Sequence, residues 1–200
     1  MSSLLFEQFK CKGLSLENRF VMAPMTRTFS PNGVPGDDVA KYYARRAAAN
    51  VGLIITEGTV TDRPGSSDNN NYPMFHGKTA LNGWNNVVTS THQAGGKIAP
   101  QLWHVGMIRK PGTGHNPEAQ TDGPSGITHS GKSIMPAPSD EEVADMVSSY
   151  ARSARDAKKL GFDAIEIHGA HGYLIDQFFW GVMNKTEKGI TDFSLGGLPL

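Results

Sequence analysis

The sequence predicts an α/β fold in which parallel strands are joined by helices. Two observations predict this class. Short apolar runs alternate along the chain with loops and amphipathic stretches, and no short repeat or low-complexity tract breaks the alternation. In addition, residues 52–56 are apolar on both faces, as expected for a strand buried inside a parallel sheet. A chain of 200 residues has room for one domain or at most two small ones.

Four apolar runs are the expected strands. They span residues 19–23, 52–56, 97–103 and 162–167. Pro24 ends the first of them. Pro100 lies inside the third and removes one backbone donor from the sheet, which is unusual for a strand interior. The four runs and the stretches between them make four strand–helix units, of which the last is incomplete.

Helices and long loops are expected between the strands. Residues 38–49 and 81–93 repeat apolar side chains at helical spacing, and Asp37 is the expected N-cap of the first helix. Residues 60–78 and 105–138 have no period and are rich in Gly, Pro and polar side chains, so they are expected to be loops. A long loop in a compact domain is usually functional or mobile.

The third helix has the clearest boundaries in the sequence. Ser139 and Glu142 have the spacing of a capping box, and Gly161 is the expected stop. Its predicted buried stripe consists of Val143, Met146, Val147, Tyr150, Ala154 and Ala157. Residues 173–180 are a further candidate helix.

Composition excludes several classes of function. Lys+Arg and Asp+Glu number 19 each, which argues against nucleic acid or a membrane surface as the main partner. The longest strongly apolar run, near residues 53–55, is far shorter than the roughly 20 residues of a membrane span. The first seven residues lack the pattern of a signal peptide. Cys11 is the only cysteine, so no internal disulfide is expected, and a reducing cytoplasm is the expected location.

Polar side chains follow every predicted strand. In parallel α/β barrels the ligand site lies at the carboxyl ends of the strands. In chain order, the candidate residues at these ends are Pro24, Met25 and Thr26; Glu57, Gly58 and Thr59; Gln101, Trp103 and His104; and His168, His171 and Tyr173. A ligand site at these ends is therefore expected.

The densest of these groups is His168, His171 and Tyr173. Two imidazoles three residues apart on one face of a turn can donate hydrogen bonds to one anionic or carbonyl oxygen. The Tyr173 hydroxyl is a candidate proton donor. An isolated histidine pair of this spacing is more often structural or solvated. A zinc hydrolase would need His104 as a third ligand, and the sequence has no His-Glu-x-x-His motif or cysteine partner for it.

Gln101 and Trp103 alternate along one strand and therefore face the same side. A glutamine amide offers both a donor and an acceptor, which suits the amide-rich edge of a heterocycle such as a flavin pyrimidine ring. Taken alone, such a pair is more often structural. Thr26 and Gly58, each taken alone, are ordinary loop and turn residues.

Together these segments resemble the old yellow enzyme family of FMN-dependent ene-reductases. The resemblance extends from about residue 4 to residue 185. The matching segments are Leu5-Phe6, Leu14-x-Leu16-x-Asn18-Arg19, Ala23-Pro24-Met25-Thr26-Arg27, Tyr42-Tyr43-Ala44-Arg45-Arg46, residues 52–59, Gln101-Leu102-Trp103-His104-Val105-Gly106 and residues 161–179.

The resemblance implies a fold and a division of the chain. The implied fold is of (β/α)8 TIM-barrel lineage, with only about the first four βα units present as a half-barrel. Residues 1–185 would form the N-terminal half of an FMN-binding α/β barrel, and residues 186–200 a divergent C-terminal tail.

The resemblance also implies a reaction, in which hydride passes from NADPH or NADH through FMN to the alkene of a small enone-type substrate. The implied FMN-binding residues are Pro24, Met25, Thr26, Gly58 and Gln101; the implied catalytic residues are His168, His171 and Tyr173; and Trp103 and His104 would line the substrate pocket. The two histidines would hold the substrate carbonyl oxygen, and the tyrosine would deliver a proton.

Asn184-Lys185-Thr186 begins like a segment of the family, and the sequence then departs from the family pattern. Family members bind the FMN phosphate with later barrel units, so two outcomes are open. The chain is either an FMN-dependent oxidoreductase or a truncated, catalytically incompetent member that acts as a non-enzymatic or oligomerising protein. Two open half-barrels could pair, which leaves a homo-oligomer open as well.

Overall fold

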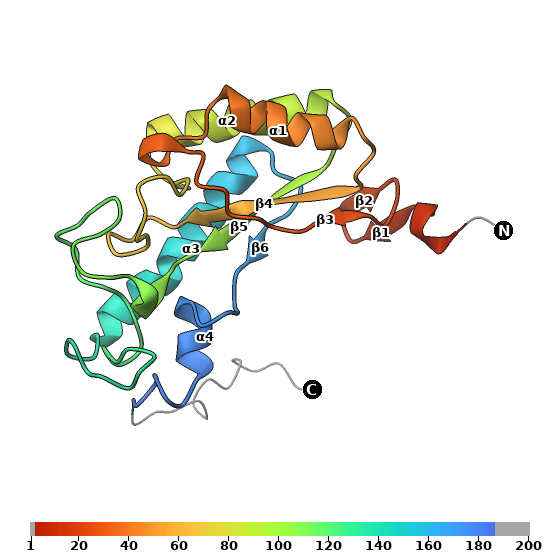
Figure 1. Cartoon of the computed structure of the whole chain (residues 1–200). Helices are drawn as coiled ribbons and strands as arrows, with labels where there is room; N and C mark the ends of the chain where they lie inside the picture. Colours follow the sequence, from red (N-terminus) through yellow and green to blue (C-terminus); the bar gives the residue numbers. More distant parts are fainter. Residues whose placement is uncertain (1–2, 187–200) are drawn as a thin grey trace. The chain divides into compact units, whose positions relative to one another are not determined.

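The computed structural model describes residues 3–186, which form two compact units (Figure 1). Within the described residues, the first unit contains residues 3–62, 69–103 and 149–167. The second contains residues 63–68, 104–148 and 168–186. The predicted tail at residues 186–200 lies outside the described residues, apart from its first residue. No helix in residues 3–186 is both long enough and apolar enough to cross a membrane.

The first unit contains a parallel sheet that confirms the predicted parallel strands. Within the described residues it has four strands in the order β3-β4-β5-β6 (Figure 1). These strands are β3 (Val21–Met22), β4 (Leu53–Val60), β5 (Ile98–Trp103) and β6 (Glu166–Ile167). The two inner strands are long and mostly buried, whereas β3 and β6 are short and lie at the sheet edges. The apolar runs thus predicted the strands. The outer two strands are shorter than their runs, because only two residues of each pair with the neighbouring strand.

A bulge in β4 explains how β5 accommodates Pro100. Ile55 pairs with Ala99 and Gly58 pairs with Gln101, so two residues of β4 face the single residue Pro100 of β5. A proline has no backbone donor, and an extra residue in the neighbouring strand avoids the need for one. The bulge lies at residues 56–57, in the middle of β4, and it sets the direction of the side chains that follow.

Two helices pack against each other beside this sheet, α1 (Asp37–Ala47) and α2 (Lys78–Gln93) (Figure 1). The core beneath them is aromatic, with Tyr43, Phe75 and Trp84 fully buried. Asp37 is not the N-cap of α1, because Gly36 takes that position and makes no side-chain cap. The Asp37 carboxylate instead accepts a hydrogen bond from Asn86 of α2 at 2.9 Å.

Helix α3 (Asp140–Leu160) begins with the predicted capping box. The Ser139 amide donates to the Glu142 carboxylate at 2.7 Å, and the Glu142 amide donates to the Ser139 hydroxyl at 3.2 Å. The predicted stripe was wrong at Val147, which is 65% exposed. The fully or nearly fully buried positions of this helix are Met146, Ser149, Ser153 and Ala157. The buried face contains two serines, so apolar character alone placed its centre about a fifth of a turn away.

The sequence did not predict the N-terminal hairpin of β1 (Phe9–Cys11) and β2 (Leu14–Leu16). Each strand has three residues, and only Leu16 is buried, so the alternation in Phe9-Lys10-Cys11 and Leu14-Ser15-Leu16 is too short to predict a strand. Lys12 lies in the turn with φ of +49°. The short 3₁₀ turns of the described chain are Leu4–Phe6, Pro31–Gly33 and Gly106–Ile108.

The second unit is mostly irregular and is built around Arg109. Its side chain is 2% exposed and donates to the carbonyls of Ser67, Thr113, Asn116 and Ala119. Within the predicted loop of residues 105–138, these bonds fix the part between residues 109 and 121. Helix α4 (Leu174–Phe179) confirms the last predicted helix.

Candidate functional site

In the first unit, three of the predicted site residues converge at the carboxyl end of β4. A Cβ atom built on Gly58 would lie 2.7 Å from Cε3 of Trp103 and 3.2 Å from Oγ1 of Thr26. The contact with Trp103 is shorter than a Cβ atom tolerates, and the contact with Thr26 is tight. Gly58 is therefore needed to let the backbone approach the Trp103 ring and the segment after β3. Tyr72, which sequence reasoning missed, packs on Trp103 with ring centroids 4.9 Å apart.

Gln101 is held by a residue on the adjacent strand. Its Nε2 donates to Oε1 of Glu166 at 2.7 Å, and its backbone amide donates to the Thr56 hydroxyl at 3.2 Å. The pair Gln101 and Glu166 are register partners of β5 and β6. One amide N–H is engaged, which leaves the second N–H and the carbonyl oxygen to offer a donor and an acceptor side by side.

Pro24, Met25 and Thr26 follow β3 at the surface of the first unit. Met25 is 51% exposed, Thr26 is exposed, and Pro24 is half-buried. This short segment therefore presents an apolar side chain and a hydroxyl to whatever binds there.

A buried ion pair anchors the segment that contains Thr26. Nη2 of Arg27 lies 2.6 Å from Oε1 of Glu57, a carboxylate that is 1% exposed. The Tyr43 hydroxyl donates to the same oxygen at 3.3 Å and accepts the Glu57 amide at 2.8 Å. Burial and the Glu57 charge raise the pKa of Tyr43, so the phenol stays protonated. The β4 bulge thus points Glu57 toward α1, where it fixes the backbone beside the site.

In the second unit, His168, His171 and Tyr173 lie together as predicted from their spacing. The His168 ring contacts the edges of the other two, with centroids 5.2 Å from His171 and 4.9 Å from Tyr173. Nδ1 of His168 accepts the Ala170 amide at 3.4 Å, so a neutral His168 carries its proton on Nε2. His171 is exposed in a left-handed conformation with φ of +59°.

Tyr173 remains a proton donor over the physiological pH range. Partial burial raises the pKa of its phenol above the ordinary value of 10.0, and the nearby Asp68 charge raises it further. Both effects disfavour the phenolate. The three rings together provide hydrogen-bond donors beside one protonated hydroxyl.

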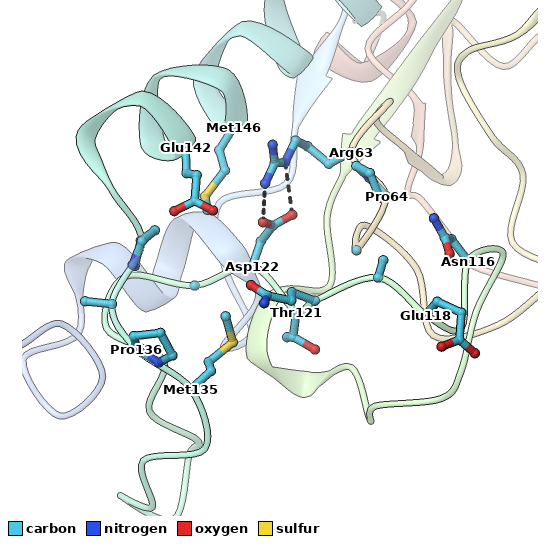
Figure 2. Close-up of a pocket in the computed structure, with 16 residues that line it drawn as sticks. Arg63, Pro64, Asn116, Glu118, Thr121, Asp122, Met135, Pro136, Glu142 and Met146 are labelled. Carbon is cyan, nitrogen blue, oxygen red and sulfur yellow. Dashed lines mark hydrogen bonds and ion pairs between the residues drawn. The ribbon is translucent and has the colours of Figure 1, made fainter.

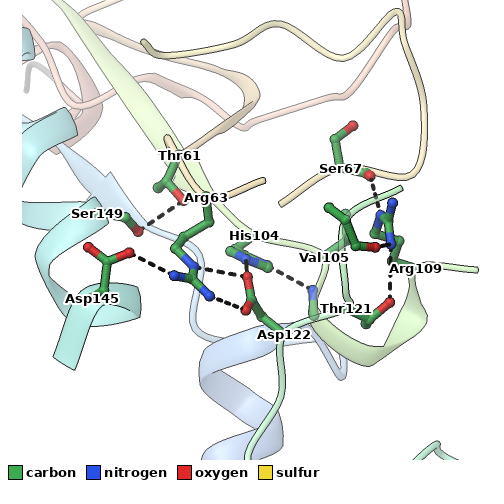
Figure 3. A network of polar contacts seen from close by, with 12 residues as sticks. Thr61, Arg63, Ser67, His104, Val105, Arg109, Thr121, Asp122, Asp145 and Ser149 are labelled. Atoms are coloured by element: carbon green, nitrogen blue, oxygen red, sulfur yellow. Dashed lines mark hydrogen bonds and ion pairs between the residues drawn. The ribbon is translucent and has the colours of Figure 1, made fainter. Parts of the chain in front are cut away.

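His104 lies in a buried polar network rather than at an open site (Figure 3). Its Nδ1 accepts the Gly106 amide at 3.0 Å, and its Nε2 donates to Oδ2 of Asp122 at 2.8 Å. Both ring nitrogens are therefore engaged, and the side chain is 0% exposed. These contacts do not favour the predicted role of His104 as a residue that lines the substrate pocket. For the same reason His104 is not available as a third metal ligand. Residues 3–186 contain no group of three or more His, Cys, Asp or Glu side chains that could hold a metal ion.

The network continues through Asp122 to Arg63 and Asp145 (Figure 3). The Arg63 guanidinium binds both Asp122 oxygens and lies 2.7 Å from Oδ2 of Asp145. Burial alone would raise the pKa of Asp122, but hydrogen bonds from His104 and Arg63 lower it to about 2. The network ties three separate chain segments of the second unit together.

A cavity of about 390 Å³ lies beside Arg63 and Asp122 (Figure 2). Its other lining residues are Pro64, Gly65, Asn116, Glu118, Ala119, Gln120, Thr121, Gly123, Met135, Pro136, Ala137, Pro138, Glu142 and Met146. The predicted site residues all lie within residues 3–186, and none lines this cavity. The predicted flavin-binding and catalytic residues therefore do not form this cavity.

A comparison with known protein families identifies the family of this chain. The family model described as "NADH:flavin oxidoreductase / NADH oxidase family" matches residues 4–189. The chain belongs to this family. The resemblance to old yellow enzymes is thereby confirmed, because old yellow enzymes are among the solved structures that share its fold.

Curated and solved relatives of this flavin oxidoreductase family agree on the fold. The chain is 36% identical over 200 residues to 12-oxophytodienoate reductase 7 of Oryza sativa subsp. japonica, covering 92% of this chain and 50% of the relative. Morphinone reductase superposes with a TM-score of 0.82 at 32% identity, over 92% of this chain and 53% of that one. Old Yellow Enzyme from Pichia sp. AKU4542 gives 0.84 at 30% identity, over 92% and 50%.

The chain thus spans about half the length of the curated relatives it matches. This agrees with its parallel sheet, which corresponds to about the first four units of a (β/α)8 barrel. The predicted fold lineage is confirmed.

Sequence reasoning missed several residues that support the site of this flavin oxidoreductase family member. Glu166 holds Gln101 and was detectable only as its register partner on the next strand. Asp176 and Gln177 bond to the turn that carries His171 and Tyr173. They lie on α4, inside the matching segment of residues 161–179, but the resemblance assigned them no role.

Proposed function

We propose that the chain binds FMN and takes part in NAD(P)H-dependent reduction of the alkene of small α,β-unsaturated carbonyl compounds. The observation that carries this proposal is the packing of His168, His171 and Tyr173, which sets two imidazoles beside a protonated phenol. Family membership supports flavin chemistry in general. The substrate class and the site roles are the proposal.

The donor set of the first unit fits FMN. Gln101 offers a donor and an acceptor in the pattern that the flavin pyrimidine edge requires. Gly58 lets its backbone pack against the Trp103 ring, and the exposed Thr26 hydroxyl lies beside it. In this proposal Gly58 and Thr26 contact the flavin, as the family resemblance implies. Pro24 and Met25 supply apolar surface from the same segment. When bound, FMN supplies the hydride. In this proposal residues 1–185 form the flavin-binding portion of the chain.

The residues of the second unit act on the substrate. His168 and His171 donate hydrogen bonds to the carbonyl oxygen and stabilise the negative charge that develops on it. Tyr173 donates its proton to the alkene carbon that does not receive hydride. Trp103 forms a wall of the pocket. His104 does not contact substrate in this proposal, because its ring nitrogens bond to Gly106 and Asp122.

A nicotinamide is the proposed reductant, and both NADH and NADPH remain candidates. One solved relative, morphinone reductase, is described in complex with tetrahydroNAD. It is 32% identical to this chain with a TM-score of 0.80. This likeness supports a nicotinamide without choosing between the two.

The test begins with the visible spectrum of the purified chain after incubation with FMN and gel filtration. Flavin eluting with the protein at about one per chain is the expected result. The loaded protein is then given NADPH or NADH and 2-cyclohexenone, with His168→Ala as the comparison variant. We expect His168→Ala to retain flavin and to lose most of the enone reduction.

Two results would contradict the proposal. If no flavin elutes with the protein, the described residues do not suffice to bind it, and the non-enzymatic, oligomerising alternative gains support. If flavin is retained but His168→Ala reduces 2-cyclohexenone as fast as the wild type, the assigned role of the histidine pair is wrong.

A further inference from the structure

Gln177 of α4 is fully buried and bonds to two separate parts of the second unit. Its Oε1 accepts the Met107 amide at 2.9 Å, in the loop that follows β5. Its Nε2 donates to the Gly172 carbonyl at 2.6 Å and to the Val105 carbonyl at 3.5 Å. A buried amide with donors and acceptors all engaged is strongly oriented, because leaving any of them unpaired would be costly.

Gly172 is held from its other side as well. Oδ2 of Asp176 accepts the Gly172 amide at 2.7 Å. Both polar groups of the Gly172 backbone therefore bond to side chains of α4. We call Asp176 and Gln177 together the Gly172 clamp.

The clamp acts on a turn that needs restraint. His171 and Gly172 are consecutive left-handed residues, with φ of +59° and +75°. A non-glycine residue such as His171 adopts this conformation at a cost, so the surrounding structure must hold it. Gly172 separates His171 from Tyr173, and its position sets where both rings lie.

The loop after β5 is shaped to admit the Gln177 amide. Gly106 has φ of +60°, and a Cβ on it would collide with the Gln177 amide group. The Leu174 amide donates to the His104 carbonyl at 3.1 Å, which is a second bond between the start of α4 and this loop. The turn is thus fixed to the loop through buried contacts.

We propose that Gln177, together with Asp176, is a positioning residue that holds His171 and Tyr173 in the geometry for reaction. This inference rests on the proposed function. Neither clamp residue is assigned a contact with substrate. A donor and a proton source act efficiently only when their distance and direction are fixed, and small misplacements are costly in rate.

Two variants separate the bonds of Gln177. Gln177→Glu keeps an oxygen for the Met107 amide but replaces the donor that reaches the Gly172 carbonyl. Gln177→Met keeps the side-chain length and removes all three bonds. Asp176→Asn retains an acceptor for the Gly172 amide and is the conservative comparison. Val182→Ala is the control, because Val182 is 42% exposed and makes no part of the clamp.

The first readout does not need activity. The imidazole resonances of His168 and His171 and the ring resonances of Tyr173 report their surroundings by NMR. We expect Gln177→Glu and Gln177→Met to shift the His171 and Tyr173 signals, and Asp176→Asn and Val182→Ala to leave them close to wild type. Unchanged signals in both Gln177 variants would overturn the proposal.

The second readout is the kinetics of FMN-loaded protein with 2-cyclohexenone. We expect kcat to fall about 10- to 100-fold in both Gln177 variants, measured where circular dichroism shows full folding. A wild-type kcat in both would overturn the positioning role. If the wild type itself reduces no enone, the proposed function fails, while the NMR signals still decide whether the clamp positions the rings.

If neither Gln177 variant folds, the wild-type chain decides the question. The side-chain amide protons of Gln177 should exchange with solvent as slowly as the core amides of the second unit. Fast exchange would mean that the amide is not held as the structure describes, and the proposal would fall.

Discussion

At the scale of single residues, the Asp122 carboxylate stabilises the second unit in a pH-dependent way. Its pKa falls from the ordinary 3.8 to about 2 because His104 and Arg63 donate to it. The folded state therefore binds this proton less readily than the unfolded state does. The resulting stabilisation, about 2 kcal/mol, is complete above about pH 4 and is lost as the pH falls toward 2.

Asp122→Asn should remove this stabilisation and leave the Arg63 charge with only Asp145 as an ionic partner. We expect the free energy of unfolding at pH 7 to fall by about 3 kcal/mol, because one member of a buried pair is removed. Urea unfolding at pH 7, 4 and 3 gives the measurement. The difference from wild type should shrink as the pH falls below 4, and a constant difference would contradict the assigned pKa.

Tyr173→Phe tests proton donation separately from packing. The phenylalanine ring keeps the edge contact with His168, whereas the hydroxyl is lost. We expect enone reduction to fall by about 10²-fold or more, as for loss of a general acid, with flavin reduction by the nicotinamide unchanged. Because the pKa of Tyr173 is raised, wild-type kcat should not decline with rising pH until above 10. Equal loss in both half-reactions would indicate a structural role instead.

At the scale of elements, the β4 bulge connects an ordinary strand to the proposed flavin site. The extra residue opposite Pro100 directs Glu57 toward α1 and leaves Gly58 against Trp103. The space at Gly58 is therefore a consequence of the strand register. This geometry makes Gly58 more sensitive to substitution than its position at a strand end would indicate.

Gly58→Ala should lower both stability and flavin affinity. The new Cβ would be too close to Trp103, and the required shift typically costs about 1–3 kcal/mol. Gly181→Ala is the matched control, since no atom lies within 4 Å of a Cβ there. Thermal unfolding and the quenching of FMN fluorescence on titration measure the two effects. Gly58→Ala with control-like values in both would refute the close approach.

The elements that the sequence predicted are those that local patterns specify. The apolar runs predicted the four strands, and Ser139 with Glu142 predicted the start of α3. The bulge depends on pairing between strands, and the N-terminal hairpin buries too little to leave a pattern. Supporting bonds such as Gln101 to Glu166 and Gln177 to Met107 join residues 65 and 70 positions apart, so no local spacing revealed them.

At the scale of the whole molecule, the parallel sheet has two open edges within the described residues. β3 and β6 each pair on one side only, and apolar side chains in or next to these strands are exposed. Val21 is 51% exposed, and Ile165 and Ile167 are 40% and 50% exposed. Unpaired parallel strands with apolar side chains are sites of association. All four strands run parallel. If two copies completed one barrel, a twofold rotation about the barrel axis would bring β3 of one copy beside β6 of the other.

We therefore expect the chain to self-associate through these edges as its concentration rises. Val21→Lys and Ile167→Lys each place a charge on one edge and should shift the molecular mass measured by light scattering toward the monomer. Val147→Lys is the control, because Val147 is also strongly exposed but lies on α3, away from the strand edges. A mass that falls equally in all three variants would point to general repulsion between charged chains. A wild-type chain that stays monomeric at high concentration would show that the open edges do not pair copies of this chain.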